Sequence, residues 1–142
     1  MKKTVLVTGA TSGIGEACAH RFAQGGYNVI ITGRRAQLLA ELKKKLEAEG
    51  AKVLALAFDV RNRAAATKAI ECLTVEWQDI DVLINNAGLA LGLEPAYEGH
   101  WDDWETMIDT NIKGLLTMTR LVTPRMVQHN SGHIINPNSY KH

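Results

Sequence analysis

The residues Thr8-Gly9-Ala10-Thr11-Ser12-Gly13-Ile14-Gly15 lie between a short β-branched run and a helical pattern. The run at 4–8 contains only Thr, Val and Leu, which predicts a buried strand. Residues 13–24 predict a helix that is entered through glycines and stopped by Gly25. A glycine-rich turn from a strand into a helix is typical of the first unit of a parallel α/β sheet.

Apolar runs and helical patterns alternate along the rest of the 142-residue chain. The expected strands are 28–32, 53–58, 82–84 and 133–135, and the expected helices are 36–49, 63–77 and 104–128. Because these strands are apolar throughout, we expect them to be buried on both faces, in a parallel sheet with helices on each side. Right-handed crossovers then predict one domain over 1–142, a doubly wound, Rossmann-like α/β fold with strand order 3-2-1-4-5.

Composition excludes several classes of protein. Hydrophobic residues make up 46% of the chain, which argues against disorder, and the formal net charge of +1 argues against a nucleic-acid binder. No apolar run approaches the roughly 20 residues that a membrane-spanning helix needs. The cysteines, Cys18 and Cys72, and the five histidines have no metal-ligand spacing, so we expect buried thiols, no metal and a soluble cytoplasmic protein.

The glycine-rich loop is the first candidate binding segment, since ligands of doubly wound sheets bind beyond the carboxyl ends of the strands. Gly9 allows a sharp turn, while Gly13 and Gly15 remove side chains where a pyrophosphate would approach the helix N-terminus. The alternative is a glycine-rich turn without a ligand. The predicted cofactor contacts of this loop are Gly9, Thr11, Ser12, Gly13, Ile14 and Gly15.

The loop after the second strand predicts which dinucleotide is bound. An NAD-binding unit has an acidic residue about 20 positions past the glycines, which accepts hydrogen bonds from the ribose. Here Gly33 stands 18 positions after Gly15 and is followed by Arg34 and Arg35. No carboxylate repels a 2′-phosphate, and two guanidiniums can bind it, so the sequence favours NADP over NAD. The alternative is a solvated basic turn.

Two further loops contain candidate cofactor contacts. The Asp59 carboxylate could accept a hydrogen bond from an adenine amine while Val60 packs on the ring; alternatively, Asp59 caps the helix that starts near Asn62. After the fourth strand, the paired amides of Asn85 and Asn86 could tie neighbouring loops together, and Ala87 and Gly88 could form a floor for ribose and nicotinamide; alternatively, this segment is a plain turn.

Together these motifs resemble the short-chain dehydrogenase/reductase family. They are TGATSGIG at 8–15, Asp59-Val60, NNAG at 85–88 and Asn111 within DTNIKG at 109–114, in family order. The segments 85–96 and 103–120 look most like NADP-dependent 3-hydroxy acid dehydrogenases that act on serine and allo-threonine. The resemblance implies hydride transfer between nicotinamide and a small carbonyl or secondary-alcohol substrate.

The resemblance also implies catalytic residues. Asn111 matches the family's proton-relay asparagine, although a polar side chain there could instead face solvent or bend the helix. Ser139 falls at the position of the serine that orients the carbonyl. Tyr140 and Lys141 are adjacent, whereas the family's Y-x-x-x-K pattern puts both side chains on one helix face, so their roles are not carried over.

We therefore expect the chain to be the N-terminal, cofactor-binding part of such an enzyme, truncated and inactive or nearly so by itself. The alternative is a non-catalytic NADP-binding module or an inactive fragment. An S-adenosylmethionine-dependent methyltransferase would need an acid where Gly33 stands.

The expected helix 104–128 predicts a homo-oligomer, since in the family this helix forms a dimer interface. Its apolar residues are too many for one stripe, which implies burial on more than one side. They are Met107, Ile108, Leu115, Leu116, Met118, Leu121, Val122 and Met126. The strand 133–135 would also be an open sheet edge, so we expect the 142-residue chain to self-associate or aggregate.

Overall fold

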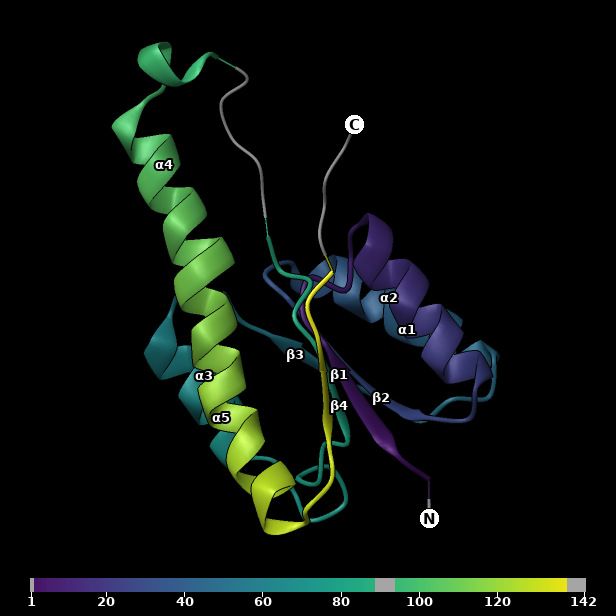
Figure 1. The fold of residues 1–142 in the computed structure, drawn as a ribbon. Coiled ribbons are helices and arrows are strands. Elements are labelled where there is room, and N and C mark those ends of the chain that lie inside the picture. Colours follow the sequence, from purple (N-terminus) through teal and green to yellow (C-terminus); the bar gives the residue numbers. More distant parts are fainter. Residues whose placement is uncertain (1, 89–93, 138–142) are drawn as a thin grey trace.

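A parallel sheet of five strands forms the centre of the structure (Figure 1), a computed structural model that describes residues 2–88 and 94–137. The strands are β1 (Thr4–Val7), β2 (Asn28–Gly33), β3 (Val53–Ala57), β4 (Val82–Ile84) and β5 (His133–Ile135). Their order is β3-β2-β1-β4-β5 and every neighbouring pair is parallel. The predicted Rossmann-like sheet and its strand order are confirmed.

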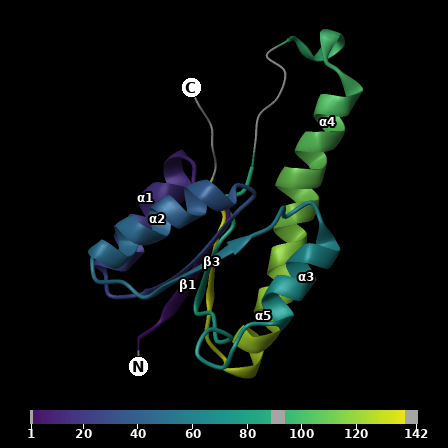
Figure 2. The ribbon, with the colours of Figure 1, turned by 180° about the vertical axis from the view of Figure 1, so that it is seen from behind.

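Helices cover both faces of this sheet. In Figures 1 and 2, α1 (Gly13–Gln24) and α2 (Ala36–Ala48) lie on one face, and α3 (Arg63–Glu71) and α5 (Leu115–Gln128) lie on the other. Alternate residues of β1 point into the two layers: Val5 and Val7 pack with α1 and α2, whereas Leu6 packs with α3 and α5. All three are fully buried, as the continuous apolar pattern of the strand predicted.

The third helix is shorter than predicted. It ends at Glu71 rather than at Trp77, and the chain then turns so that the Trp77 N–H donates to the Thr74 carbonyl oxygen over 2.9 Å. This turn buries the Trp77 indole in the α3–α5 layer. The pattern of 63–77 predicted one continuous helix, because a turn that returns a side chain to the same layer leaves a similar apolar pattern.

The expectation of buried thiols is also wrong: Cys18 is half-buried and Cys72 is exposed.

The predicted helix 104–128 is interrupted. It begins at Trp101 with α4 (Trp101–Ile108), continues through a π-helical turn, η2 (Asp109–Gly114), and ends as α5; a short 3-10 turn, η1 (Ala96–Glu98), precedes it. Gly114 is buried in η2, and a Cβ there would lie 2.7 Å from Val60 Cγ2, so glycine permits close packing beside β3. None of the helices in the described part of the chain is both long and apolar enough to cross a bilayer.

One side chain caps α3, and it is Asn62 rather than Asp59. Asn62 Oδ1 accepts a hydrogen bond from the Ala65 N–H over 3.0 Å. Asp59 Oδ1 instead accepts from the Arg61 N–H, in a turn that precedes the helix. The alternative interpretation of Asp59 as the helix cap is therefore wrong.

Replacing this cap tests the local account of α3. We expect Asn62→Ala to lower the free energy of unfolding by about 1 kcal/mol, because the Ala65 N–H loses its acceptor. Asn62→Asp keeps an acceptor and should stay within a few tenths of a kcal/mol of the unmodified chain. Urea unfolding followed by circular dichroism measures both, and equal stability of the alanine variant and the unmodified chain would contradict the assignment.

Candidate cofactor-binding site

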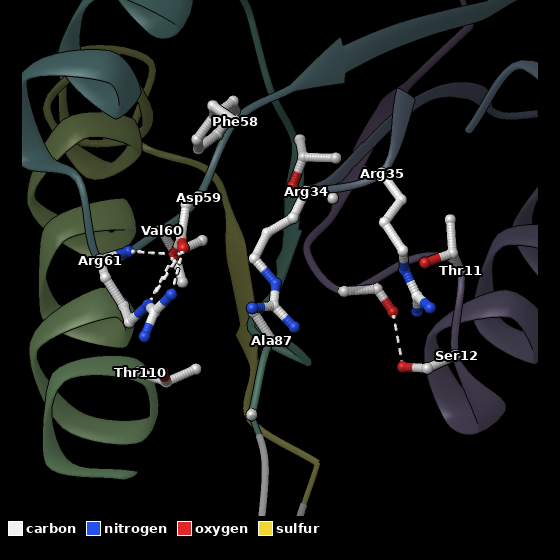
Figure 3. A pocket seen from close by; sticks show the side chains of 14 residues that line it. Thr11, Ser12, Arg34, Arg35, Phe58, Asp59, Val60, Arg61, Ala87 and Thr110 are labelled. Carbon is white, nitrogen blue, oxygen red and sulfur yellow. Dashed lines mark hydrogen bonds and ion pairs between the residues drawn. The ribbon is translucent and has the colours of Figure 1, made fainter. Parts of the chain in front are cut away.

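A pocket lies at the carboxyl ends of the strands, where the topology predicts a ligand (Figure 3). The loops after β1, β2, β3 and β4 each contribute to its wall, together with η2. Its predicted members are Gly9, Thr11, Ser12, Arg34, Arg35, Asp59, Val60, Ala87 and Gly88, and it also contains Thr32, Gly33, Phe58, Arg61 and Thr110. Four separate loops, which the sequence pointed to independently, thus meet at one place.

Four predicted residues lie behind this wall rather than in it. Gly13, Ile14 and Gly15 form the first turn of α1, where the Ile14 side chain is exposed. A Cβ at Gly15 would collide with the Gly9 carbonyl oxygen and the Asn86 amide. That amide donates to the Gly9 carbonyl oxygen over 3.1 Å, so Asn86 ties two loops together as expected. Gly15 and Asn86 thus hold the loop at Gly9, which lines the pocket.

Gly9 brings the loop after β1 against the loop after β4. Its φ is +59°, and a Cβ there would lie 2.9 Å from the Ala87 Cα. Both the conformation and the close approach therefore require glycine.

The Thr8 hydroxyl joins the same two loops from below. Thr8 Oγ1 accepts hydrogen bonds from the Asn86 N–H at 3.0 Å and the Ala87 N–H at 2.9 Å, and donates to the Ile84 carbonyl oxygen at 3.3 Å. The side chain is fully buried. Sequence reasoning treated Thr8 only as the end of a strand, although a buried hydroxyl in that position needs partners.

Asn85 extends this network to the far side of the sheet. Its Nδ2 donates to Thr119 Oγ1 on α5 and to Asn136 Oδ1 after β5, both at 3.1 Å. The carboxyl ends of β4 and β5 and the middle of α5 are thereby fixed relative to one another.

Arg34 and Arg35 supply the positive charge of the pocket. Both are exposed and extend from the end of β2 toward the pocket in Figure 3. Within residues 2–88 and 94–137 neither side chain makes a hydrogen bond or an ion pair. The Arg34 charge acts on Asp59 without contacting it, and two guanidiniums that make no ion pair leave a local excess of positive charge that suits an anionic group.

The opposite wall contains a charge that is already paired. The Arg61 guanidinium donates to both carboxylate oxygens of Asp59, with Nη2 2.7 Å from Oδ2 and Nε 3.2 Å from Oδ1 (Figure 3). The Arg61 hydrogen bonds hold the pKa of the Asp59 carboxyl below its ordinary value, against the opposing effect of burial. Asp59 is thus ionised at neutral pH and can only accept hydrogen bonds.

Val60 and Thr110 line the pocket beside Asp59. Val60 is buried against Gly114, and Thr110, on η2, is 7% exposed with an Oγ1 that has no hydrogen-bond partner in the described structure. The sequence analysis missed both Thr110 and Arg61. Thr110 adjoins the Asn111 motif and Arg61 lies two residues from Asp59. Their place in the pocket wall depends on the tertiary structure, so spacing along the chain does not reveal it.

Asn111 lies in the π-helical turn between α4 and α5. The residue is exposed, and a Cβ on Gly88 would lie 3.0 Å from its Oδ1, so the side chain approaches the backbone at the end of the pocket. Such π-turns are frequent at functional sites. Ser139, Tyr140 and Lys141 lie outside the described residues. Over the described ranges, no group of three potential metal-binding side chains comes together.

Residues 3–141 match the short chain dehydrogenase family. The chain belongs to this family. It is 59% identical over 132 residues to the "NADP-dependent 3-hydroxy acid dehydrogenase YdfG" of Salmonella typhi, covering 93% of this chain and 52% of that protein. It is 46% identical over 139 residues to the "Serine 3-dehydrogenase" of Rhizobium radiobacter, covering 98% of this chain and 54% of that protein. The chain thus spans about half the length of the curated relatives it matches.

Solved structures share the fold. The closed form of a serine dehydrogenase complexed with NADP+ superimposes with a TM-score of 0.88 at 56% identity, over 94% of this chain and 52% of that one. A metagenomic short-chain oxidoreductase in complex with NADP reaches a TM-score of 0.91 at 29% identity, over 98% of this chain and 63% of that one.

The Thr8 hydroxyl offers a test of how the two loops are held together. We expect Thr8→Val to lower the free energy of unfolding by about 1–3 kcal/mol, because two N–H groups lose their acceptor while the side-chain volume is kept. Thr8→Ser retains the hydroxyl and should recover most of that loss. Denaturant unfolding of the three proteins decides the matter: a valine variant as stable as the unmodified chain would show that the hydroxyl does not hold the loops.

Proposed function

We propose that this chain binds NADP(H) in the pocket described above and is the cofactor-binding part of an oxidoreductase. The reaction would move hydride between the nicotinamide and a carbonyl or secondary alcohol, such as that of a 3-hydroxy acid. The observation that carries the proposal is the pair Arg34 and Arg35, unpartnered within the described chain, at the end of β2, where an NAD-specific site has an acid. The names of the relatives support the same cofactor and substrate class.

The residues of the pocket fit the parts of this cofactor. The N-terminus of α1, where Gly13 leaves open space and Gly15 packs against the loop at Gly9, would bind the pyrophosphate. Arg34 and Arg35 would bind the 2′-phosphate. Asp59 would accept from the adenine amine, with Val60 beneath the ring. When bound, the nicotinamide supplies or accepts the hydride.

The nicotinamide end would rest on Ala87 and Gly88, held by the Thr8 and Asn86 hydrogen bonds. Asn111, whose side chain approaches Gly88, would take part in the proton relay. Ser139 would orient the substrate carbonyl, as the family resemblance implies.

Cofactor preference tests this proposal. NADPH should bind at least tenfold more tightly than NADH, because two charge-assisted contacts are worth about 1.5 kcal/mol or more each. Arg34→Ala should weaken NADPH binding and leave NADH binding nearly unchanged. Isothermal titration calorimetry measures both affinities, with Arg21→Ala on the exposed side of α1 as a control for lost charge. Equal affinities for the two cofactors, or equal losses in Arg34→Ala, would refute the assignment.

We further propose that the chain forms a homo-oligomer through α4, η2 and α5. Within the single chain only one side of α5 is buried. Its buried residues are Met118, Val122 and Met126. The other side carries exposed residues at helical spacing, here termed the outer stripe: Glu105, Ile108, Ile112, Leu116 and Arg120. The expected burial on more than one side therefore requires a partner. No residue of α4 is buried, and α4 extends beyond the sheet (Figure 1).

The charges on the outer stripe support an antiparallel pairing of two copies. The apolar residues Ile108, Ile112 and Leu116 lie in its centre, with Glu105 before them and Arg120 after them. A two-fold axis near Ile112 would place the apolar centres together and bring Glu105 of each chain opposite the partner's Arg120. The interface would then be self-complementary in both charge and hydrophobicity.

Charge reversal tests this register. Glu105→Arg and Arg120→Glu should each weaken association, because each places like charges opposite one another, and the double variant should restore it. Light scattering coupled to size exclusion measures the effect, with Lys44→Glu on α2 as a control for altered net charge. Unmodified protein that stays monomeric, or a double variant as weak as the single ones, would contradict this interface.

A further inference from the structure

We propose that Arg61 is a specificity-determining positioning residue: it holds the Asp59 carboxylate as a fixed hydrogen-bond acceptor, so that the pocket selects a 6-amino purine over a 6-oxo purine. The inference rests on the proposed binding of NADP(H) and concerns the base at the adenine end of that site.

The geometry around Asp59 fixes both carboxylate oxygens. Oδ1 accepts from the Arg61 backbone N–H at 2.9 Å and from Nε at 3.2 Å. Oδ2 accepts from Nε at 3.0 Å and from Nη2 at 2.7 Å. Arg61 thus holds the Asp59 carboxylate through both its backbone and its side chain, which leaves the carboxylate little freedom to rotate.

This pair is not explained by the folding of the neighbouring helix. Asn62 caps α3, and the turn before it is closed by the Asn62 N–H donating to the Asp59 carbonyl oxygen over 2.9 Å. The Asp59 and Arg61 side chains remain partly exposed, at 27% and 35%, and both line the pocket. A partly exposed ion pair contributes little stability, so a role in binding accounts better for its four hydrogen bonds.

A hydrogen-bond donor follows the acceptor directly in the chain. The backbone N–H of Val60, whose side chain is buried in the pocket wall, makes no hydrogen bond within residues 2–88 and 94–137. An acceptor beside a donor matches the edge of adenine, which presents the 6-amino donor beside the N1 acceptor. A 6-oxo purine presents the reverse pattern: its carbonyl oxygen would face the carboxylate, and its N1–H would face another N–H.

Arg61 keeps the acceptor in place. Its backbone and side-chain hydrogen bonds fix the orientation of both Asp59 oxygens. Without Arg61, the carboxylate could rotate away from the carbonyl oxygen of a 6-oxo base. The acceptor would then adapt to either base, and selection would weaken.

The test compares NADPH with reduced nicotinamide hypoxanthine dinucleotide phosphate, which differs only in having a 6-oxo base. Calorimetry on the full chain should show at least a tenfold preference for NADPH, and Arg61→Gln should reduce it to about threefold or less. Arg61→Lys keeps the charge but cannot hydrogen-bond to both Asp59 oxygens, so it should also lower the preference for NADPH over the hypoxanthine analogue. Arg63→Gln removes a neighbouring charge that does not contact Asp59 and should leave the preference unchanged. In every variant the preference for NADPH over NADH should persist.

The outcomes separate this inference from the function on which it rests. If Asp59→Asn abolishes base selection but both Arg61 variants retain it, the adenine subsite stands and the role of Arg61 is overturned. An unmodified chain that binds both bases equally also overturns it. If the chain binds neither NADPH nor its hypoxanthine analogue, the proposed function fails, and this inference fails with it. Loss of selection in Arg63→Gln to the same degree would show a general effect of charge rather than positioning.

Discussion

The close approach of two backbone loops controls the rest of the structure. Gly9 and Gly15 allow the turn after β1 to reach the loop after β4, where any side chain would collide with Ala87 or Asn86. The hydroxyl of Thr8 and the amide of Asn86 then hold the two loops in contact through hydrogen bonds. The floor of the pocket is consequently backbone, and a flat or anionic ligand can come close to it.

The charged side chains around the pocket comprise one ion pair and two arginines that form no ion pair. On one side Asp59 and Arg61 neutralise each other, so that the carboxylate acts as an oriented acceptor rather than as a source of repulsion. On the other side Arg34 and Arg35 make no hydrogen bond or ion pair in the described chain, although the Arg34 charge also helps to lower the pKa of Asp59. One end of the pocket is therefore suited to a neutral base and the other to a phosphate. The 2′-phosphate of NADP would pair with the two arginines, whereas the ribose hydroxyls of NAD would leave them unpaired.

Sequence reasoning placed the strands, their order and the four binding loops, because strands buried on both faces leave a continuous apolar pattern and the chain then has few possible connections. The expected burial on both faces is wrong for β5, whose three residues are exposed at the edge of the sheet. Sequence reasoning also failed where tertiary contacts altered a helix. The turn that buries Trp77 and the π-helical turn around Asn111 both keep apolar residues in register, so periodicity cannot detect them. Arg61 and Thr110 were missed because their importance depends on what lies across the pocket, not on spacing along the chain.

We expect Arg34 and Arg35 to bind the 2′-phosphate, and the paired Asp59 carboxylate to bind the base, of the same adenosine half of the dinucleotide. A crystal structure of this chain with NADPH tests it most directly. The account predicts the 2′-phosphate within hydrogen-bonding distance of the Arg34 and Arg35 guanidiniums, and the adenine amine donating to an Asp59 oxygen that Arg61 still holds. A 2′-phosphate bound away from both arginines, or an adenine that makes no contact with Asp59, would contradict it.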